Sequence, residues 1–162
     1  MTLSHVDGSG RARMVDVGDK PESVRTARAA GRIRMSDEAY RLVERNSGPK
    51  GNVVSTAELA GTMGAKRTAE LIPLCHPIGL DHVETVARLD AGLPGVRVEA
   101  TARAVGRTGV EMEALTAVTV ALLTVYDMVK AAGHTMEIGE VRLLEKAGGT
   151  TGNWKSDNEA FA

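Results

Sequence analysis

The stretch GVEMEALTAVTVALLTVYDMVKAA, residues 109–132, decides how the rest of the chain can fold. After its first residue it contains no Gly or Pro, and its middle holds only apolar residues and threonines. Glu111 and Glu113 stand near its start, and Asp127 and Lys130 stand near its end. Charge beside an apolar core needs a partner or a ligand. The stretch therefore predicts the central helix of an enzyme.

Composition limits the classes of protein to consider. The chain has 162 residues, enough for one domain with a hydrophobic core. Its net charge of −1 and its aromatic content of 2% argue against a nucleic-acid partner. Cys75 is the only cysteine, which excludes a disulfide framework within one chain. No basic leader precedes an apolar N-terminal run, and no apolar run reaches ~18 residues. We therefore expect a cytoplasmic protein without a membrane partner.

The N-terminal part predicts an arm, a strand and a helix. Residues 1–24 are rich in Gly, Asp and Arg, and we expect an extended arm, with a frayed terminus as the alternative for residues 1–10. Residues 25–35 alternate in a way that suits a half-exposed strand. Ser36 can then cap a helix that ends near the turn cluster at residues 46–49.

The middle of the chain predicts a second helix and then strands. Asn52 can cap a helix over residues 53–66, and its small residues permit close helix packing. The proline-broken segment 71–78 suits neither a helix nor a central strand. Strands are expected on both sides of a turn-rich connection and again after the long helix, at residues 82–89, 96–105 and 136–144.

The predicted order of elements is strand, helix in two pieces, strand, strand, helix, strand. This is the βαββαβ plan of ferredoxin-like α+β proteins, in which helices pack on one face of an antiparallel sheet. We expect a single domain over residues 1–162, with a polar tail at residues 150–162.

Two pairs of charges on the long helix are candidates for chemistry. Asp127 and Lys130 are three positions apart and are neighbours on a helix, so they predict a surface ion pair or an acid/base pair with mutually shifted pKa values. Glu111 and Glu113 either compensate the helix dipole or accept hydrogen bonds from the N–H groups of a purine-like ring. Glu113 and Asp127 lie roughly 20 Å apart along a helix. Either the ligand is long, such as a nucleoside triphosphate, or two subunits share the site, and we predict the second.

The segment that contains Cys75 and His76 lies between prolines. Adjacent residues rarely face each other as nucleophile and base, so we expect a packing role for Cys75. His76 is better placed to bind a ligand or transfer a proton. No metal site is expected, because the other histidines show no ligand spacing with His76: His5, His82 and His134. No P-loop or dinucleotide-binding glycine motif is present, so separate cations would have to bind any phosphate.

Several stretches carry a resemblance to a known family. They are SHVDGSGRARMVDV (4–17), AKRT (65–68) with LIPLCHPI (71–78), GVEMEALTAVTVALLTVYDMVKA (109–131) and VRLLEKAGG (141–149). Together they resemble the molybdenum cofactor biosynthesis protein C family, the cyclic pyranopterin monophosphate synthases. The resemblance covers nearly the whole chain and implies a ferredoxin-like fold and a homohexamer, a trimer of dimers with sites at the dimer interface.

The resemblance also implies a reaction. A lyase of this family converts a small molecule, the 3′,8-cyclised dihydro-GTP, to cyclic pyranopterin monophosphate and releases pyrophosphate. No cofactor is required, although magnesium can accompany the triphosphate. At Thr150 and Thr151 this chain departs from the Lys-Ser that many relatives have.

The family resemblance assigns roles to individual residues. It implies catalytic roles in proton transfer or triphosphate binding for Asp127, Lys130 and Lys50. It implies substrate contacts from two segments, with Leu74, Cys75 and His76 in one and Glu111, Met112 and Glu113 in the other. The cations expected near the phosphates are Lys66, Arg25 and Lys146, since the departure of pyrophosphate needs positive charge near the leaving oxygens.

Two other functions stay open at this point. Ferredoxin-like domains also serve as non-catalytic sensors of small molecules, and a fold alone does not decide function. A nucleotide pyrophosphohydrolase would act on plain GTP and would need a cluster of acids to hold magnesium, which the spacing of acids does not predict.

Overall fold

The computed structural model describes residues 9–46, 50–150 and 152–157. The strands are β1 (Ser23–Arg34), β2 (His82–Asp90), β3 (Gly95–Gly106), β4 (Glu137–Ala147) and β5 (Trp154–Lys155). The helices are α1 (Asp37–Glu44), α2 (Val53–Ala65), α3 (Thr68–Leu71), α4 (Glu111–Val129) and the 3₁₀ turn η1 (Lys130–Ala132).

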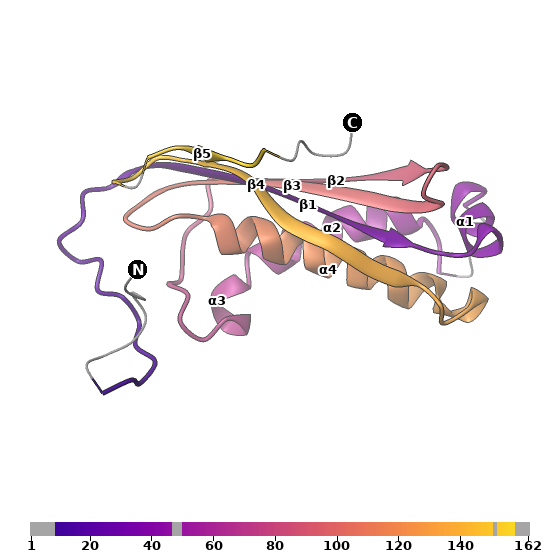
Figure 1. Cartoon of the computed structure of the whole chain (residues 1–162), viewed down its shortest axis with the longest axis horizontal. Helices are drawn as coiled ribbons and strands as arrows, with labels where there is room; N and C mark the ends of the chain where they lie inside the picture. Colours follow the sequence, from indigo (N-terminus) through magenta and orange to yellow (C-terminus); the bar gives the residue numbers. More distant parts are fainter. Residues whose placement is uncertain (1–8, 47–49, 151, 158–162) are drawn as a thin grey trace.

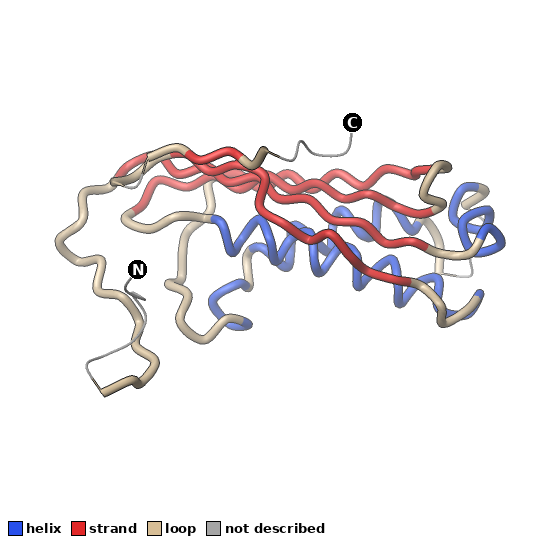
Figure 2. Tube along the Cα trace, in the orientation of Figure 1, coloured by secondary structure: helices blue, strands red, loops and turns tan. Residues whose placement is uncertain are grey.

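The strands form one antiparallel sheet, and the long helices lie on one of its faces. The order in the sheet is β2-β3-β1-β4-β5, so β1 pairs with both β3 and β4. Figures 1 and 2 show α2 and α4 side by side under the sheet, with α1 at one end and α3 toward the other. The neighbours β2-β3-β1-β4 give the ferredoxin-like order, which confirms the predicted α+β fold.

Local signals in the sequence set the starts of the first helices. The side chain of Ser36 accepts a hydrogen bond from the backbone N–H of Ala39 at 3.2 Å, and Asn52 accepts one from Ser55 at 3.0 Å. Both bonds satisfy an N–H group that a helix start leaves without an intrahelical partner. Both predicted caps are therefore confirmed.

The core between α4 and the sheet is built from small and branched side chains. Aromatic residues make up only 2% of the chain, so large rings cannot fill this layer. Instead, the buried positions of β1 and β3 are mostly alanines and valines, which let α4 approach closely: Ala27, Ala29, Val96, Val98, Ala100, Ala102 and Ala104. At Gly31 a Cβ atom would lie 2.8 Å from Val118 and 2.9 Å from Leu122 of α4. The side chains of α4 therefore pack directly against the backbone of the sheet at Gly31.

The packing of α2 against α4 depends on glycines in α2. A Cβ atom at Gly61 would lie 2.7 Å from the Cγ2 of Thr85 and 2.9 Å from the carbonyl oxygen of Ala117. A Cβ atom at Gly64 would lie 2.8 Å from the side chain of Val120. The expected close packing of the small-residue helix is therefore observed.

Length and composition alone would allow the stretch Glu111–Ala132 to cross a membrane. In this fold, however, 50% of its apolar window is buried inside the protein. Val118, Ala121, Leu122 and Val125 of α4 are fully buried in the core that the helix shares with the sheet. This packing accounts for the apolar composition of the helix.

The structure differs from the sequence predictions in three places. The short helix α3 precedes the proline-broken segment. The last strand continues past Leu144 to Ala147, which places Lys146 in the sheet. The polar tail contains β5, which pairs with β4 through Lys146 and Trp154. Parts of the predicted arm, turn cluster and tail lie outside the described residues: residues 1–8, 47–49, 151 and 158–162.

We expect Gly61→Ala to lower the free energy of unfolding by about 1–3 kcal/mol, because the new methyl group meets backbone and side-chain atoms. This outcome opposes the usual helix preference for alanine, worth about 1 kcal/mol. Urea denaturation at one fixed protein concentration measures it. The matched control is Gly79→Ala, where a Cβ atom meets nothing within 4 Å. Equal stability of the two variants would contradict the packing argument.

Candidate functional site

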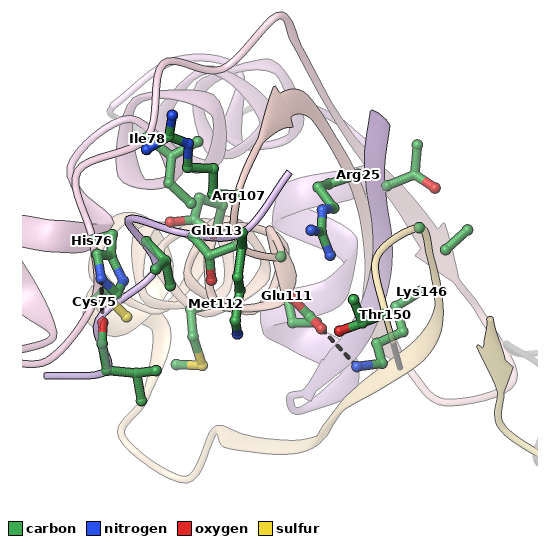
Figure 3. Close-up of a pocket in the computed structure, with 18 of the residues that line it drawn as sticks. Arg25, Cys75, His76, Ile78, Arg107, Glu111, Met112, Glu113, Lys146 and Thr150 are labelled. Carbon is green, nitrogen blue, oxygen red and sulfur yellow. Dashed lines mark hydrogen bonds and ion pairs between the residues drawn. The ribbon is translucent and has the colours of Figure 1, made fainter. Parts of the chain in front are cut away.

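A cavity of about 540 Å³ opens at the N-terminal end of α4. Four parts of the chain line it: the arm with the start of β1, the loop after α3, the β3–α4 connection with the first turn of α4, and the end of β4 with the residues that follow it. Figure 3 shows labelled side chains from several of these segments around the cavity, with Glu111 directed toward Lys146. The predicted residues that line it are Arg25, Leu74, Cys75, His76, Glu111, Met112, Glu113 and Lys146.

The acidic part of the cavity comes from the first turn of α4. Glu113 is only 3% exposed, and burial, with a further contribution from Glu111, raises the pKa of its carboxyl group. Glu111 forms an ion pair with Lys146, in which Oε1 and Nζ are 3.0 Å apart. The cavity therefore holds one carboxylate with a cationic partner and one buried carboxyl group whose ionisation is opposed.

Arg25 is a buried cation on the cavity wall. Its Nε donates a hydrogen bond of 3.3 Å to the carbonyl oxygen of Gly106. Gly148 and Gly149 turn around it with φ of +94° and +82°, and a Cβ atom on Gly149 would clash with the guanidinium group. The side chain of Asn153 accepts a hydrogen bond from Gly148 N–H at 3.2 Å. The glycine pair therefore provides both the conformation and the space that Arg25 needs.

The loop after α3 contributes a histidine and a thiol. His76 Nε2 lies 2.9 Å from the carbonyl oxygen of Val15, so this nitrogen carries a hydrogen and donates a hydrogen bond to the arm. Burial, with a smaller contribution from Glu113, raises the pKa of the Cys75 thiol. The protonated thiol is a poor nucleophile, which favours the packing role over a Cys/His nucleophile pair.

A second charged cluster lies at the opposite end of α4. Lys50 Nζ donates to Asp127 Oδ2 at 2.6 Å and to the Asp127 carbonyl oxygen at 3.0 Å. Lys130 Nζ donates to Asp127 Oδ1 at 2.6 Å. The bonds from Lys130 and Lys50 lower the pKa of Asp127 to about 2, and Asp127 raises the pKa of Lys130. We call these three residues the Lys–Asp–Lys cluster.

The predicted site residues therefore fall into two groups. The cavity and the Lys–Asp–Lys cluster are joined by α4, and Glu113 and Asp127 are separated by roughly 20 Å of helix. Lys66 follows α2 as its C-cap residue, is exposed, and lies outside the lining of the cavity. Its proposed contact with phosphate stays a prediction.

The structure adds lining residues that the sequence did not single out. Val15 and Val17 of the arm line the cavity beside Lys20, and Arg107 enters from the β3–α4 connection. Thr150 also lines it, whereas Thr151 lies outside the described residues. Arg107 stands just before the acidic first turn of α4, and this position could have indicated from the sequence that it lines the cavity. The arm carries no such signal, because its place depends on contacts across the fold.

Within residues 9–46, 50–150 and 152–157, no group of three or more His, Cys, Asp or Glu side chains could hold a metal ion. The site is therefore described by its protein groups alone.

Comparisons with known proteins give a consistent result. The model of the MoaC family matches residues 14–149. Cyclic pyranopterin monophosphate synthase from Roseiflexus sp. (strain RS-1) is 54% identical over 155 residues, covering 96% of this chain and 98% of that protein. The protein of the same name from Methylobacterium sp. (strain 4-46) is 56% identical over 156 residues, with 96% and 98% covered. That from Brucella ovis is 52% identical over 159 residues, with 98% and 96% covered.

We expect Glu113→Gln to raise the melting temperature at neutral pH. Because the folded-state pKa of Glu113 lies above its ordinary value of 4.5, wild-type stability falls as the pH rises from that value through the raised one. Glutamine cannot ionise, so the variant avoids this loss, and the difference should vanish below pH 4.5. Thermal unfolding from pH 4 to 8 measures it. Glu111→Gln is the control, since it loses the ion pair with Lys146 and should show no such gain. A Glu113→Gln variant that is less stable at neutral pH would contradict the argument.

The Asp127 carboxyl group should titrate near pH 2 when followed by carbon NMR. The stabilisation from its lysine partners is present above the ordinary pKa of 3.8 and is lost as the pH falls through about 2. Lys130→Ala should move the midpoint up toward 3.8, and Lys50→Ala should move it by less, because Lys130 is the larger influence. Lys66→Ala is the control and should leave it unchanged. An unmoved midpoint in Lys130→Ala would refute this view of the Lys–Asp–Lys cluster.

Proposed function

The chain belongs to the MoaC family, and we propose that it is a lyase that forms cyclic pyranopterin monophosphate in molybdenum cofactor biosynthesis. Its substrate is the 3′,8-cyclised dihydro-GTP, and pyrophosphate is the second product. The observation that carries the proposal is the placement of two charged centres at the ends of one buried helix, each rich in groups that bind phosphate or move protons.

The cavity supplies groups for both ends of such a substrate. The carboxyl groups of Glu111 and Glu113 can accept hydrogen bonds from ring N–H groups, the task for which carboxylates suit a purine-derived ring. Arg25 and Lys146 supply cations for the phosphate oxygens, and a planar guanidinium group can bind two oxygens at once. Leu74 and Met112 add apolar surface for the flat ring. These contacts orient the substrate and stabilise the negative charge that develops when pyrophosphate leaves.

The Lys–Asp–Lys cluster supplies the proton transfers. The low pKa of Asp127 makes this carboxyl group a weak base at neutral pH, so its first task is to hold both ammonium groups in place. Lys130 and Lys50 then act as the proton donors when the ring opens and recloses. This assignment refines a simple acid/base pair of Asp127 and Lys130, since both members are held in their charged forms.

The distance between the two centres favours an oligomer. A single small substrate cannot span the roughly 20 Å of α4 that separates Glu113 from Asp127. Leu59 and Met63 of α2 and Leu123 of α4 are at least half exposed in the isolated chain, as expected for surfaces that contact other copies. A cytoplasmic homohexamer built as a trimer of dimers would bring the cavity of one copy to the Lys–Asp–Lys cluster of another. Magnesium would enter only with the triphosphate.

One assay separates the candidate functions. The purified chain is mixed with the cyclised GTP intermediate, and pyrophosphate is measured together with the fluorescent pterin formed on oxidation of the product. Release of both in equal amounts supports the synthase. Binding without release would indicate a sensor, and release of pyrophosphate from plain GTP would indicate a pyrophosphohydrolase.

Mixing two inactive variants tests whether subunits share the site. Glu113→Ala and Asp127→Ala should each abolish turnover but leave the assembly folded. Under proven subunit exchange, an equal mixture should recover about a quarter of wild-type activity, because random pairing leaves that fraction of shared sites intact. The control mixture is Asp127→Ala with Lys130→Ala, where both changes affect the same cluster and no recovery is expected. No recovery in the first mixture would contradict a shared site.

A further inference from the structure

The N-terminal arm forms one wall of the cavity. Val15 and Val17 are half-buried on the cavity side of the arm, and Lys20 follows them into the lining. The arm precedes β1 and joins neither a helix nor the main sheet at these positions. Its position must therefore depend on contacts other than a strand ladder.

Two side chains from the body of the fold hold the arm. His76 donates to the carbonyl oxygen of Val15 at 2.9 Å. Arg107 Nη1 donates to the carbonyl oxygen of Gly18 at 2.9 Å, and its Nε lies 3.8 Å from Glu22 Oε1. Residues 18 and 107 are 89 positions apart, so this bond joins distant parts of the chain.

The arm has a fixed shape between these two contacts. Gly18 N–H donates to the side chain of Asp16 at 2.8 Å, and Lys20 N–H donates to the carbonyl oxygen of Val17 at 3.1 Å. These bonds form a compact turn over residues 16–20. Arg107 donates a hydrogen bond to the carbonyl oxygen of Gly18 inside this turn. It therefore fixes the position of the backbone that carries the Lys20 side chain.

The loop that carries Arg107 is itself held rigidly. The preceding residue, Gly106, is the end of β3 and accepts a hydrogen bond from the buried Arg25. Val110, three residues after Arg107, is only 1% exposed and is the N-cap residue of α4. The β3–α4 connection therefore ties the arm to the same backbone that positions Arg25.

We propose that Arg107 is a positioning residue that latches the arm across the cavity and so places Lys20 beside the substrate's anionic groups. Its Nη1 donates a hydrogen bond to the carbonyl oxygen of Gly18, and its Nε is paired with Glu22. Its effect on the reaction therefore passes through the arm. The functional half of this inference rests on the proposed synthase activity, whereas the latch itself is independent of it.

Hydrogen exchange of the free protein tests the latch without any substrate. In Arg107→Ala, the backbone amides of residues 16–20 should exchange roughly tenfold faster than in wild type, because one charge-assisted bond holds the turn against the body. Arg107→Lys keeps the charge and one donor and should restore part of the protection. Arg103→Ala removes an exposed arginine of β3 that is not among the residues lining the cavity, and it should leave exchange unchanged. Unchanged exchange in Arg107→Ala would overturn the latch.

Pyrophosphate release tests the functional half. Arg107→Ala and Lys20→Ala should each lower kcat/KM roughly tenfold, mainly through a higher KM, and the double variant should lose little more than either single variant. Arg103→Ala should retain wild-type kinetics. Multiplied losses in the double variant would show that Arg107 contacts the substrate directly and would overturn the positioning role. A wild-type protein that releases no pyrophosphate would refute the proposed function, and the exchange result would still decide the latch.

Discussion

The close approach of α4 to the sheet is the constraint on which the rest of the structure depends. A chain with 2% aromatic residues has few large side chains to fill a wide gap between layers, so the layers must come together. Alanines on β3 and Gly31 on β1 let the sheet approach one side of α4, and Gly61 lets α2 approach another. The helix is thereby held as a rigid rod, and its two charged ends keep a constant separation. The proposed site, divided between those ends, would require this rigidity.

The surroundings at the two ends of α4 shift the pKa of a carboxyl group in opposite directions. Glu113 at the N-terminal end is almost fully buried, so desolvation raises its pKa, and the neighbouring Glu111 adds repulsion. Asp127 at the other end is exposed and lies between two ammonium groups, so hydrogen bonds lower its pKa. Two carboxyl groups on one helix therefore hold protons very differently. This contrast suits a reaction that needs ring recognition at one place and proton donation at another.

Local features were predictable from sequence, whereas single long-range contacts were not. The caps Ser36 and Asn52 act within three residues, and the four main strands follow from alternation and turn residues. The strand β5 has only two residues, and its existence depends on pairing with β4. Likewise, the residues near Gly18 give no signal of its hydrogen bond with Arg107, which is 89 positions away in the sequence. Helix geometry gave the separation of Glu113 from Asp127 and the family resemblance paired Glu113 with His76, but the arm residues that complete the cavity emerge only from the fold.

The Lys–Asp–Lys cluster describes a resting state rather than a working one. Both lysines are paired with the Asp127 carboxylate, and this pairing raises the pKa of Lys130. A triphosphate carries more negative charge than one carboxylate, so its arrival from a neighbouring copy would compete with Asp127 for the ammonium groups. A lysine drawn toward phosphate leaves Asp127 with one partner fewer, and the pKa of Asp127 then rises toward its ordinary value. At its ordinary pKa of 3.8 the Asp127 carboxyl group is still ionised at neutral pH, so proton donation would stay with the lysines.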